Sequence, residues 1–417
     1  MHARLREATQ ILRGLPPVAL YLSPVLSNRA GPSGGTEAKE SGMVAQGASD
    51  IELSLIAPTY NERENVVPLV ERVHKALSQY RYELIIVDDN SPDGTAELAK
   101  TLATRYPLQV VVRTNERGLA SAVVAGFGRS RGQVLCVIDA DLQHPPEAIP
   151  ALLKAVREGA DIAIASRYIA GGGIEGWSAR RKAISQAAKI PAVLFLSRAR
   201  KIKDPLSGFF LFRKSVIEGV TLSPIGYKIL LEVLVKGNPA KVVEVPYIFR
   251  GRERGKSNLT TREQVNYLRH LGRLAWFEGG LKRFLKFCVV GASGFGVNLG
   301  LLALFVKVAH MNETVAQIPS YQISIITNFA FNEFWTFSDR RTPGLKSFLV
   351  RAVKFDLVSQ GGWGINLGVY YLALNIAGIY YIVSEIIAIA VTTLWNFFVN
   401  VMWTWRKTRE TEQQSHA

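Results

Sequence analysis

Short apolar runs and amphipathic stretches alternate along the chain after residue 50. Runs typical of strands lie at 53–57, 84–87, 109–113 and 134–138, and stretches with helical spacing lie between them at 64–78, 95–106 and 118–130. The apolar residues within each run are consecutive, which is typical of strands buried on both faces of a parallel sheet. Strands that alternate with helices predict parallel βαβ units with right-handed crossovers. We therefore predict an α/β domain over residues 51–260.

The last third of the chain has a different pattern, with four long apolar segments at roughly 285–309, 315–337, 350–374 and 380–405. Each is close to the ~20 residues that a helix needs to span a bilayer. The segments also form a repeat, because the sequence GFGVNLG at 294–300 recurs 68 residues later as GWGINLG at 362–368. A constant offset across two helices predicts a duplicated helical pair. We expect a four-helix all-α transmembrane domain over residues 285–405.

Asparagines recur within these apolar segments. We predict that they form interhelical hydrogen bonds, and a path for lipid headgroups is the alternative. The six residues are Asn298, Asn328, Asn332, Asn366, Asn396 and Asn400.

Lysine and arginine are concentrated in two of the segments that flank the predicted spans. The region between spans two and three contains Arg340, Arg341, Lys346, Arg351 and Lys354, and the tail at 406–417 begins with Arg406, Lys407 and Arg409. The four apolar segments predict an integral membrane protein with four spans. Basic loops stay on the cytoplasmic side of the membrane. The α/β domain and both chain ends would therefore be cytoplasmic.

Two further segments complete the predicted organisation. Residues 1–50 contain Gly-, Pro- and Ser-rich stretches and are expected to be a disordered tail. Segment 261–284 joins the two domains, and it carries apolar residues every three positions with arginines between them. This pattern predicts an amphipathic helix in the membrane surface, although a helix packed on the α/β core would look similar. The apolar row consists of Val265, Leu268, Leu271, Leu274 and Phe277.

The composition adds a preference for anionic partners. The formal net charge is +16 and 48% of the residues are hydrophobic, which together favour phosphates or anionic membrane lipid as partners. No DNA- or RNA-binding signature occurs, so nucleic acid is not an expected partner. The two cysteines, Cys136 and Cys288, lie in apolar runs and are expected to be reduced thiols.

Acidic and amide side chains follow three of the predicted strands. The segment PTYNE at 58–62 follows the first strand, Asp88 and Asp89 follow the second, and DADLQH at 139–144 follows the run at 134–138. Open α/β sheets bind ligands at the carboxyl ends of their strands. Clustered oxygen ligands suit Mg²⁺ or Mn²⁺ bound to a phosphate, and a sugar nucleotide carries such a diphosphate. We expect Asp88 to share its role with turn capping, and His144 to be structural or to support the ligands.

These motifs together resemble the family 2 glycosyltransferases, and more closely the dolichyl-phosphate (polyprenyl-phosphate) mannosyltransferases. The resemblance rests on PTYNE, VDDNSPDGTAE and DADLQHPPE, and it continues through the segments at 166–168, 204–210, 226–232 and 252–259. The duplicated spans resemble the GtrA-like membrane domain. The resemblance implies a GT-A fold, which is nucleotide-sugar-binding and Rossmann-like, followed by the transmembrane helices.

The resemblance also implies a role for individual residues. Asp141 and Gln143 would hold the metal, and Arg167, Arg181 and Ser185 would bind the acceptor phosphate. The catalytic set would be Asp139, Asp141, Arg167 and Arg252. The donor nucleotide sugar would contact Pro58, Tyr60, Glu62, Val87, Asp89, Asp139, Ala140, Asp141, Gln143, Lys228 and Arg252. One departure is Asn258, which stands where the family has a lysine, with Lys256 two residues away.

The implied reaction is the metal-dependent, inverting transfer of mannose from GDP-mannose to dolichyl or polyprenyl phosphate. An acceptor phosphate is already anionic at neutral pH and needs no general base, whereas arginines can position it through their forked donors. One alternative is a polyprenyl-phosphate glucosyltransferase that uses UDP-glucose. Another is a non-catalytic lipid-translocating or anchoring protein. The QxxRW motif of processive polysaccharide synthases does not occur after Asp204.

Overall fold

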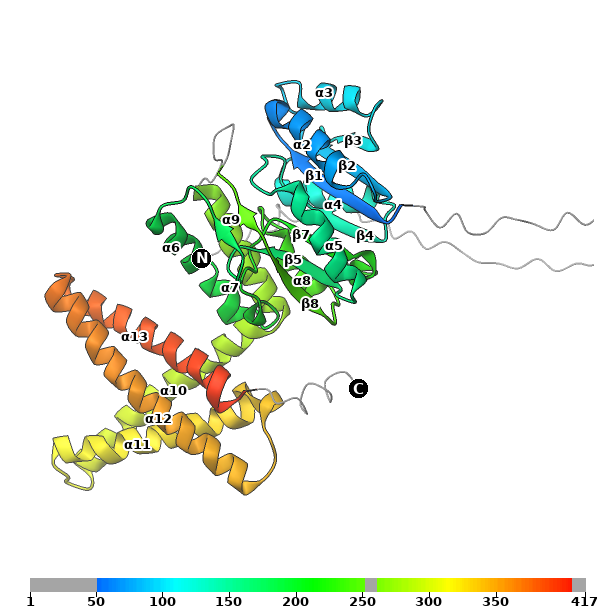
Figure 1. Cartoon of the computed structure of the whole chain (residues 1–417). Helices are drawn as coiled ribbons and strands as arrows, with labels where there is room; N and C mark the ends of the chain where they lie inside the picture. The colour runs from blue at the N-terminus through cyan, green and yellow to red at the C-terminus, as the bar shows by residue number, and fades with distance from the viewer. Residues whose placement is uncertain (1–50, 252–260, 407–417) are drawn as a thin grey trace, which may run out of the picture. The chain divides into compact units, whose positions relative to one another are not determined.

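The computed structural model describes residues 51–251 and 261–406 (Figure 1). The predictions for residues 1–50 and 407–417, and those for Arg252, Lys256 and Asn258, lie outside the described residues.

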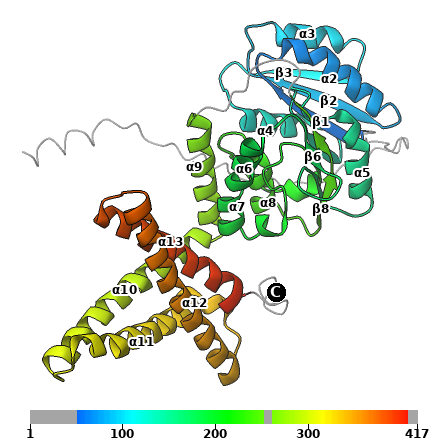
Figure 2. The same cartoon turned by 60° about the vertical axis from the view of Figure 1, so that its left-hand side comes forward.

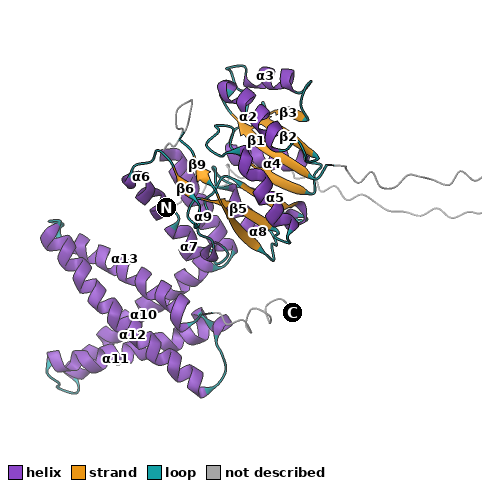
Figure 3. Ribbon diagram, in the orientation of Figure 1, coloured by secondary structure: helices purple, strands orange, loops and turns teal. Residues whose placement is uncertain are grey.

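The α/β domain contains a seven-stranded sheet with the order β3-β2-β1-β4-β7-β5-β8 (Figure 3). Neighbouring strands pair in parallel except β7, which is antiparallel to both β4 and β5. The first four strands confirm the predicted parallel units, and β7 departs from them. The strands are β1 (Leu53–Thr59), β2 (Tyr82–Asp88), β3 (Leu108–Val112), β4 (Val134–Val137), β5 (Ile162–Ser166), β7 (Phe210–Arg213) and β8 (Val242–Pro246).

Helices cover both faces of this sheet because the central strands place buried side chains on either side. In β1, Leu53 and Leu55 face one hydrophobic cluster, and Ile56 faces the other. The first cluster includes α2 (Arg63–Ala76), α3 (Thr95–Leu102) and α5 (Ile149–Arg157). The second includes α4 (Leu119–Arg129) and α8 (Ile229–Lys236). Both faces of the central strands are therefore covered, as their consecutive apolar residues indicated.

The α/β domain also contains a two-stranded sheet and two further helices. β6 (Gly173–Ile174) pairs in parallel with β9 (Ile248–Phe249), and the helices α6 (Ala179–Ala188) and α7 (Ile190–Phe195) follow β6 in the chain. Short 3₁₀ turns, η1 (Pro146–Ala148), η2 (Ala199–Lys201) and η3 (Lys214–Ile217), connect other elements.

The amphipathic segment forms α9 (Thr261–Phe277), which ends before Gly279, a residue in the left-handed region with φ +79°. Leu271 and Leu274 are buried against residues of α7 and α8. Val265 and Leu268 stay exposed on the same helix. α9 thus packs on the α/β domain with one part of its apolar row and leaves the other part uncovered. Its predicted position in the membrane surface stays a prediction.

Four long helices make up the C-terminal domain (Figures 1 and 2). The sequence-based boundary at residue 284 falls inside the first of them. Two segments, Gly280–Lys307 and Tyr381–Thr404, are long and apolar enough to cross a membrane. The helices are α10 (Gly280–Lys307), α11 (Glu313–Phe331), α12 (Leu345–Tyr371) and α13 (Tyr381–Val399), with the π turns η4 (Asn332–Thr336), η6 (Leu372–Ile376) and η7 (Asn400–Thr404), and the 3₁₀ turn η5 (Ser338–Arg340).

The structure repeats at the same 68-residue offset as the sequence. α10 packs along α11, and α12 packs along α13. A Cβ atom on Gly294 would overlap the Asn328 amide, and one on Gly362 would overlap the Asn396 amide. The duplicated helical pair is therefore present as predicted, with a glycine–asparagine contact in each copy.

Phe337 and Trp405, which are also 68 residues apart, stack on each other in the core of the membrane domain. Their ring centroids are 4.2 Å apart with an interplanar angle of 7°. Both side chains are fully buried. The two copies of the repeat thus meet through equivalent aromatic residues.

The prediction of interhelical asparagine hydrogen bonds is wrong for two residues. The side-chain amide nitrogen of Asn332 donates to the backbone carbonyl of Asn328, and that of Asn400 donates to the backbone carbonyl of Asn396. Both bonds stay within one helix and enter a π turn, where a side chain can reach the carbonyl four residues earlier.

Candidate active site

The three acidic segments leave the sheet at the same edge. β1 lies between β2 and β4, and all three strands run in parallel. Thr59 at the end of β1 is in register with Asp88 at the end of β2. The strand order reverses direction at β1, which makes this edge the switch point where open α/β sheets bind ligands.

The loop after β4 holds Asp139, Asp141 and Gln143 in a fixed turn. Leu142 has a φ of 62°, and the backbone N–H of Gln143 donates to Asp141 Oδ1 at 3.1 Å. The side-chain amide nitrogen of Gln143 donates to the Arg250 carbonyl at 3.3 Å. Ala140 and Asp141 are buried, whereas Asp139 is half-buried.

The chemistry of this loop fits a divalent cation. The Asp141 carboxylate and the Gln143 amide oxygen are the hard oxygen donors that Mg²⁺ and Mn²⁺ prefer. Because the Gln143 nitrogen is engaged by Arg250, the amide oxygen is oriented as the acceptor. Two protein ligands leave coordination positions for the oxygens of a diphosphate. No group of three or more His, Cys, Asp or Glu side chains suited to a metal occurs within 51–251 and 261–406.

The His144 ring contacts the Asp139 carboxylate. Its Nε2 lies 3.1 Å from Asp139 Oδ2, and its Nδ1 lies 3.0 Å from the Tyr247 hydroxyl. The ring is buried between the aromatic rings of Phe209 and Phe249. These contacts agree with the expected supporting role, and they make His144 the residue that orients the Asp139 carboxylate.

Asp88 and Asp89 have different partners. Asp88 is fully buried and accepts hydrogen bonds from the Thr59 hydroxyl and from the backbone and hydroxyl of Ser91. It therefore fixes the turn after β2. Asp89 pairs with Arg113, whose Nε donates at 2.8 Å, and also accepts from the Gly118 N–H at 2.7 Å.

The other predicted nucleoside contacts lie around these two carboxylates. Pro58 and Val87 are buried neighbours in register on β1 and β2. Tyr60 is 39% exposed, with the Arg117 guanidinium 5.2 Å from its ring centroid. Glu62 caps α2, where its N–H donates to the Thr95 hydroxyl. An aromatic face and buried backbone at one edge suit a nucleoside.

Arg167 and Asp204 form a buried bidentate pair. Nε of Arg167 donates to Oδ2 at 2.7 Å, and its terminal nitrogen donates to Oδ1 at 2.8 Å. Their side chains are 9% and 1% exposed. Burial lowers the pKa of Arg167, but the hydrogen bonds and charge of Asp204 outweigh it, so the net pKa is raised. Arg167 is therefore a permanent cation held in one orientation.

Arg181 and Ser185 lie on α6 and face the same neighbourhood. The Ser185 hydroxyl is 2.9 Å from the Tyr168 hydroxyl. The Arg181 guanidinium lies 4.1 Å from the Trp177 ring centroid, and Trp177 contacts Phe249 edge-to-face. The Arg167 guanidinium lies 5.5 Å from the ring centroid of Phe249. The two predicted acceptor-binding arginines are thus joined through two aromatic rings.

Lys228 lies close to the Arg167–Asp204 pair. Its amino group donates to the Leu206 carbonyl at 2.9 Å. Burial and the charge of Arg167 lower the pKa of Lys228, the charges of Asp139 and Asp204 oppose them, and the net pKa is about 8. These four charged groups therefore share one environment, whose two cations suit phosphate oxygens.

Sequence reasoning assigned no role to Asp204 or Arg113. Asp204 was the single charge in the motif DPLSGFF, and Arg113 was the last residue of a predicted strand. Both proved to be ion-pair partners of predicted site residues. No local signal identified these partners, because each pairing depends on the tertiary fold.

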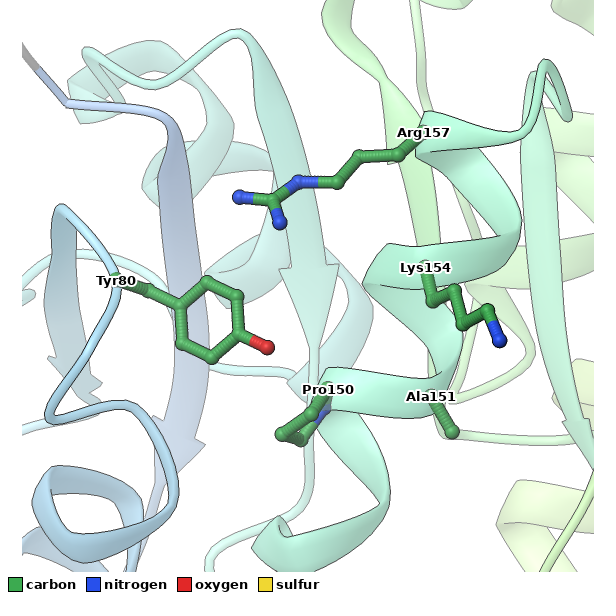
Figure 4. A pocket seen from close by; sticks show the side chains of 5 residues that line it. All are labelled: Tyr80, Pro150, Ala151, Lys154 and Arg157. Atoms are coloured by element: carbon green, nitrogen blue, oxygen red, sulfur yellow. The ribbon is translucent and has the colours of Figure 1, made fainter.

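A separate pocket, shown in Figure 4, lies away from these residues. It is lined by Tyr80, Pro150, Ala151, Lys154 and Arg157. It includes none of the predicted site residues, and Arg157 is paired with Glu52 ahead of β1. This pocket therefore does not belong to the candidate site.

Comparison with known proteins follows the same division of the chain. Residues 54–221 match the model of glycosyl transferase family 2, and residues 286–405 match the GtrA/DPMS transmembrane domain. A dolichol-phosphate mannosyltransferase of Pyrococcus furiosus is 46% identical over 355 residues, which cover 85% of this chain and 99% of the relative. The chain belongs to the dolichol-phosphate mannosyltransferase family.

Two further proteins are similar to shorter parts of the chain. The dolichol-phosphate mannosyltransferase of Saccharomyces cerevisiae is 39% identical over 251 residues, covering 57% of this chain and 92% of the relative. Among solved structures, mannosyl-3-phosphoglycerate synthase from Rubrobacter xylanophilus matches 55% of this chain and 76% of its own, with 20% identity and a TM-score of 0.43.

For this member of the dolichol-phosphate mannosyltransferase family, the matches confirm the predicted fold class and the resemblance on which the site was assigned. A GT-A domain is followed by a helical transmembrane domain, so the chain is a membrane protein.

Proposed function

We propose that this chain transfers mannose from GDP-mannose to a polyprenyl or dolichyl phosphate. The observation that carries the proposal is the buried bidentate pair of Arg167 and Asp204, with the Lys228 amine bound to the Leu206 carbonyl and the Asp139 carboxylate close to Gly208 of the same segment. Cations for two phosphate-bearing substrates meet there beside carboxylates suited to a metal. Membership of the dolichol-phosphate mannosyltransferase family supports the same reaction.

The donor would bind across the ends of β1, β2 and β4. Its nucleoside would lie against Tyr60 and Val87, near Asp89, with its diphosphate toward Asp141 and Lys228. Asp141 and Gln143 would hold Mg²⁺ or Mn²⁺, which when bound stabilises the negative charge that develops on the leaving diphosphate.

The acceptor phosphate would bind between Arg167, Arg181 and Ser185. A phosphate monoester is already an anion at neutral pH, so no residue has to remove a proton from it. A phosphate oxygen forms a bond to the anomeric carbon of mannose while the bond to the diphosphate oxygen breaks. GDP leaves with that electron pair, and attack from the opposite face inverts the anomeric centre.

The membrane domain would keep the reaction close to its lipid substrate. We propose that all four helices span the membrane, with the GT-A domain and both chain ends on the cytoplasmic side. The basic residues between spans two and three support this orientation. Anchoring raises the effective concentration of an acceptor confined to the same bilayer.

A panel of labelled donors tests the proposal. The purified full chain is incubated with polyprenyl phosphate, Mn²⁺ or Mg²⁺, and either labelled GDP-mannose or labelled UDP-glucose. We expect label in the lipid extract with GDP-mannose. Label from UDP-glucose alone would replace the donor, and no label from either would favour a non-catalytic protein.

A further inference from the structure

The Arg340 side chain makes no hydrogen bond within the part of the chain that the structure describes. This side chain is 8% exposed, and its Nε is buried without a hydrogen-bond partner. The nearest carboxylate oxygen, Asp339 Oδ2, is 4.0 Å away and already accepts from Arg283 at 2.6 Å. Burying an unpaired charge is costly.

Two more guanidinium groups lie close to Arg340. Arg283, at the start of α10, also has a buried Nε without a partner. Burial and the positive charges of Arg283 and Arg200 together lower the pKa of Arg340 to about 10, against the opposing charge of Asp339. Arg340 therefore remains charged at neutral pH. The charge of Glu278 acts on Arg200. Arg200, Arg283 and Arg340 are thus accompanied by the two carboxylates of Glu278 and Asp339.

The fold fixes Arg340 in this position. It ends the short turn η5, where its N–H donates to the Phe337 carbonyl at 2.9 Å. Phe337 is anchored by its stack on Trp405 and by a hydrogen bond from its N–H to the Asn332 carbonyl. The backbone of Arg340 is thus attached to the buried Phe337–Trp405 stack of the membrane domain.

The surrounding residues place this cluster at the level of lipid headgroups. Trp335 and Phe334 are exposed on the preceding π turn, and the Lys286 ammonium lies 5.4 Å from the Trp335 ring centroid. The Arg341 guanidinium lies 5.3 Å from the Phe334 centroid. Exposed aromatic residues next to basic side chains are typical of the membrane–water interface.

We propose that Arg340 and Arg283 bind the phosphate group of a membrane lipid. The terminal nitrogens of Arg340 make no side-chain hydrogen bond among the described residues, and a guanidinium binds phosphate through a planar fork. The ligand is a phosphate ester on a lipid, which is either an anionic phospholipid or a polyprenyl phosphate. This site is separate from Arg167 and Arg181, and it does not depend on the proposed reaction.

Thermal unfolding of the detergent-solubilised full chain tests the site without any activity measurement. Phosphatidylglycerol, polyprenyl phosphate or phosphatidylcholine is added, and the wild type is compared with Arg340→Gln. We expect the lipid that occupies this site to raise the wild-type Tm by roughly 2–4 °C more than the Tm of the variant. Polyprenyl phosphate would also bind at Arg167 and Arg181 in both proteins, so only the difference between wild type and variant reports on this site. A difference with phosphatidylglycerol assigns a phospholipid, and a difference with polyprenyl phosphate alone assigns the acceptor lipid.

Arg341→Gln is the matched control, because it removes the same charge from an exposed neighbour in the same loop. It should keep the full wild-type shift. Without anionic lipid, Arg340→Gln should be at least as stable as the wild type, since no hydrogen bond within the described residues is lost. Arg340→Lys, which keeps the charge but not the fork, should retain part of the shift. Equal shifts in wild type and Arg340→Gln, or no shift in the wild type, would overturn the proposal.

Discussion

Replacing Asp204 by asparagine is expected to impair use of the lipid acceptor. Both carboxylate oxygens of Asp204 accept hydrogen bonds from Arg167, at 2.7, 2.8 and 3.1 Å. In asparagine an amide NH₂ group takes the place of one of the two carboxylate oxygens. In either position this NH₂ group faces an N–H donor of Arg167. At least one charge-assisted hydrogen bond is lost, and the guanidinium moves from its fixed position.

A hydrogen bond to a charged group contributes about 1.5–3 kcal/mol, which corresponds to roughly a 10- to 150-fold change in rate. We expect kcat/KM for polyprenyl phosphate to fall by about that factor, and KM for GDP-mannose to change little. The assay varies polyprenyl phosphate at saturating donor and at about pH 6, because losing the charge of Asp204 lowers the pKa of Lys228 below its wild-type value of about 8. Asp204→Ala leaves a buried cation unpaired and should lower the free energy of unfolding by about 3–5 kcal/mol.

Glu52→Gln is the matched control for Asp204→Asn. Glu52 forms the same bidentate contact with Arg157, but the two side chains are 26% and 54% exposed. An exposed pair contributes about 1 kcal/mol or less, so this variant should keep both kinetic constants. If Asp204→Asn folds like the wild type and uses polyprenyl phosphate equally well, Arg167 does not bind the acceptor as described.

Two further predictions follow from burial and close packing. The pKa of Lys228 is lowered to about 8, so deprotonation of Lys228 should make kcat/KM for GDP-mannose decline above about pH 8. Lys228→Arg should move this decline to higher pH. A pH–rate profile that both proteins share would contradict this. Lys228→Met should lose transfer without losing thermal stability, because burial disfavours the charged amine in the folded state. Gly294→Ala should lower the stability of the membrane domain by about 1–3 kcal/mol, because its Cβ would overlap Asn328. Gly296→Ala, with open space at its Cβ, should be neutral or stabilising, and equal unfolding temperatures for the two variants would refute the packing argument.

The sequence predicted those parts of the fold that depend on short-range pattern. Consecutive apolar residues identified β1 to β4, and the 68-residue repeat identified the two helical pairs. The strand β7 was not predicted, because its antiparallel direction depends on contacts with β4 and β5 from distant parts of the chain. β6 and β9 have only two residues each, which is too short for a periodic signal.

The sequence could place the proposed ligands at a sheet edge, but it could not predict the residues that contact them. Asp139 and Asp141 could be placed at a sheet edge because they follow a buried strand. The pairing of Arg167 with Asp204 joins residues 37 positions apart, and no local pattern encodes it. The same limit applies to the membrane asparagines, because the direction of the Asn332 side chain follows from the π turn that begins there.

The central claim is that a metal-dependent mannosyl transfer takes place at the Asp139–Asp141 loop. The most direct measurement is the rate at which label from GDP-mannose enters lipid in nanodiscs that contain polyprenyl phosphate, with wild type, Asp141→Ala and the exposed control Glu158→Ala. We expect transfer by the wild type and by Glu158→Ala only when Mg²⁺ or Mn²⁺ is present, and a loss of about 100-fold or more in Asp141→Ala. Transfer that persists in EDTA, or that Asp141→Ala leaves unchanged, would contradict the claim.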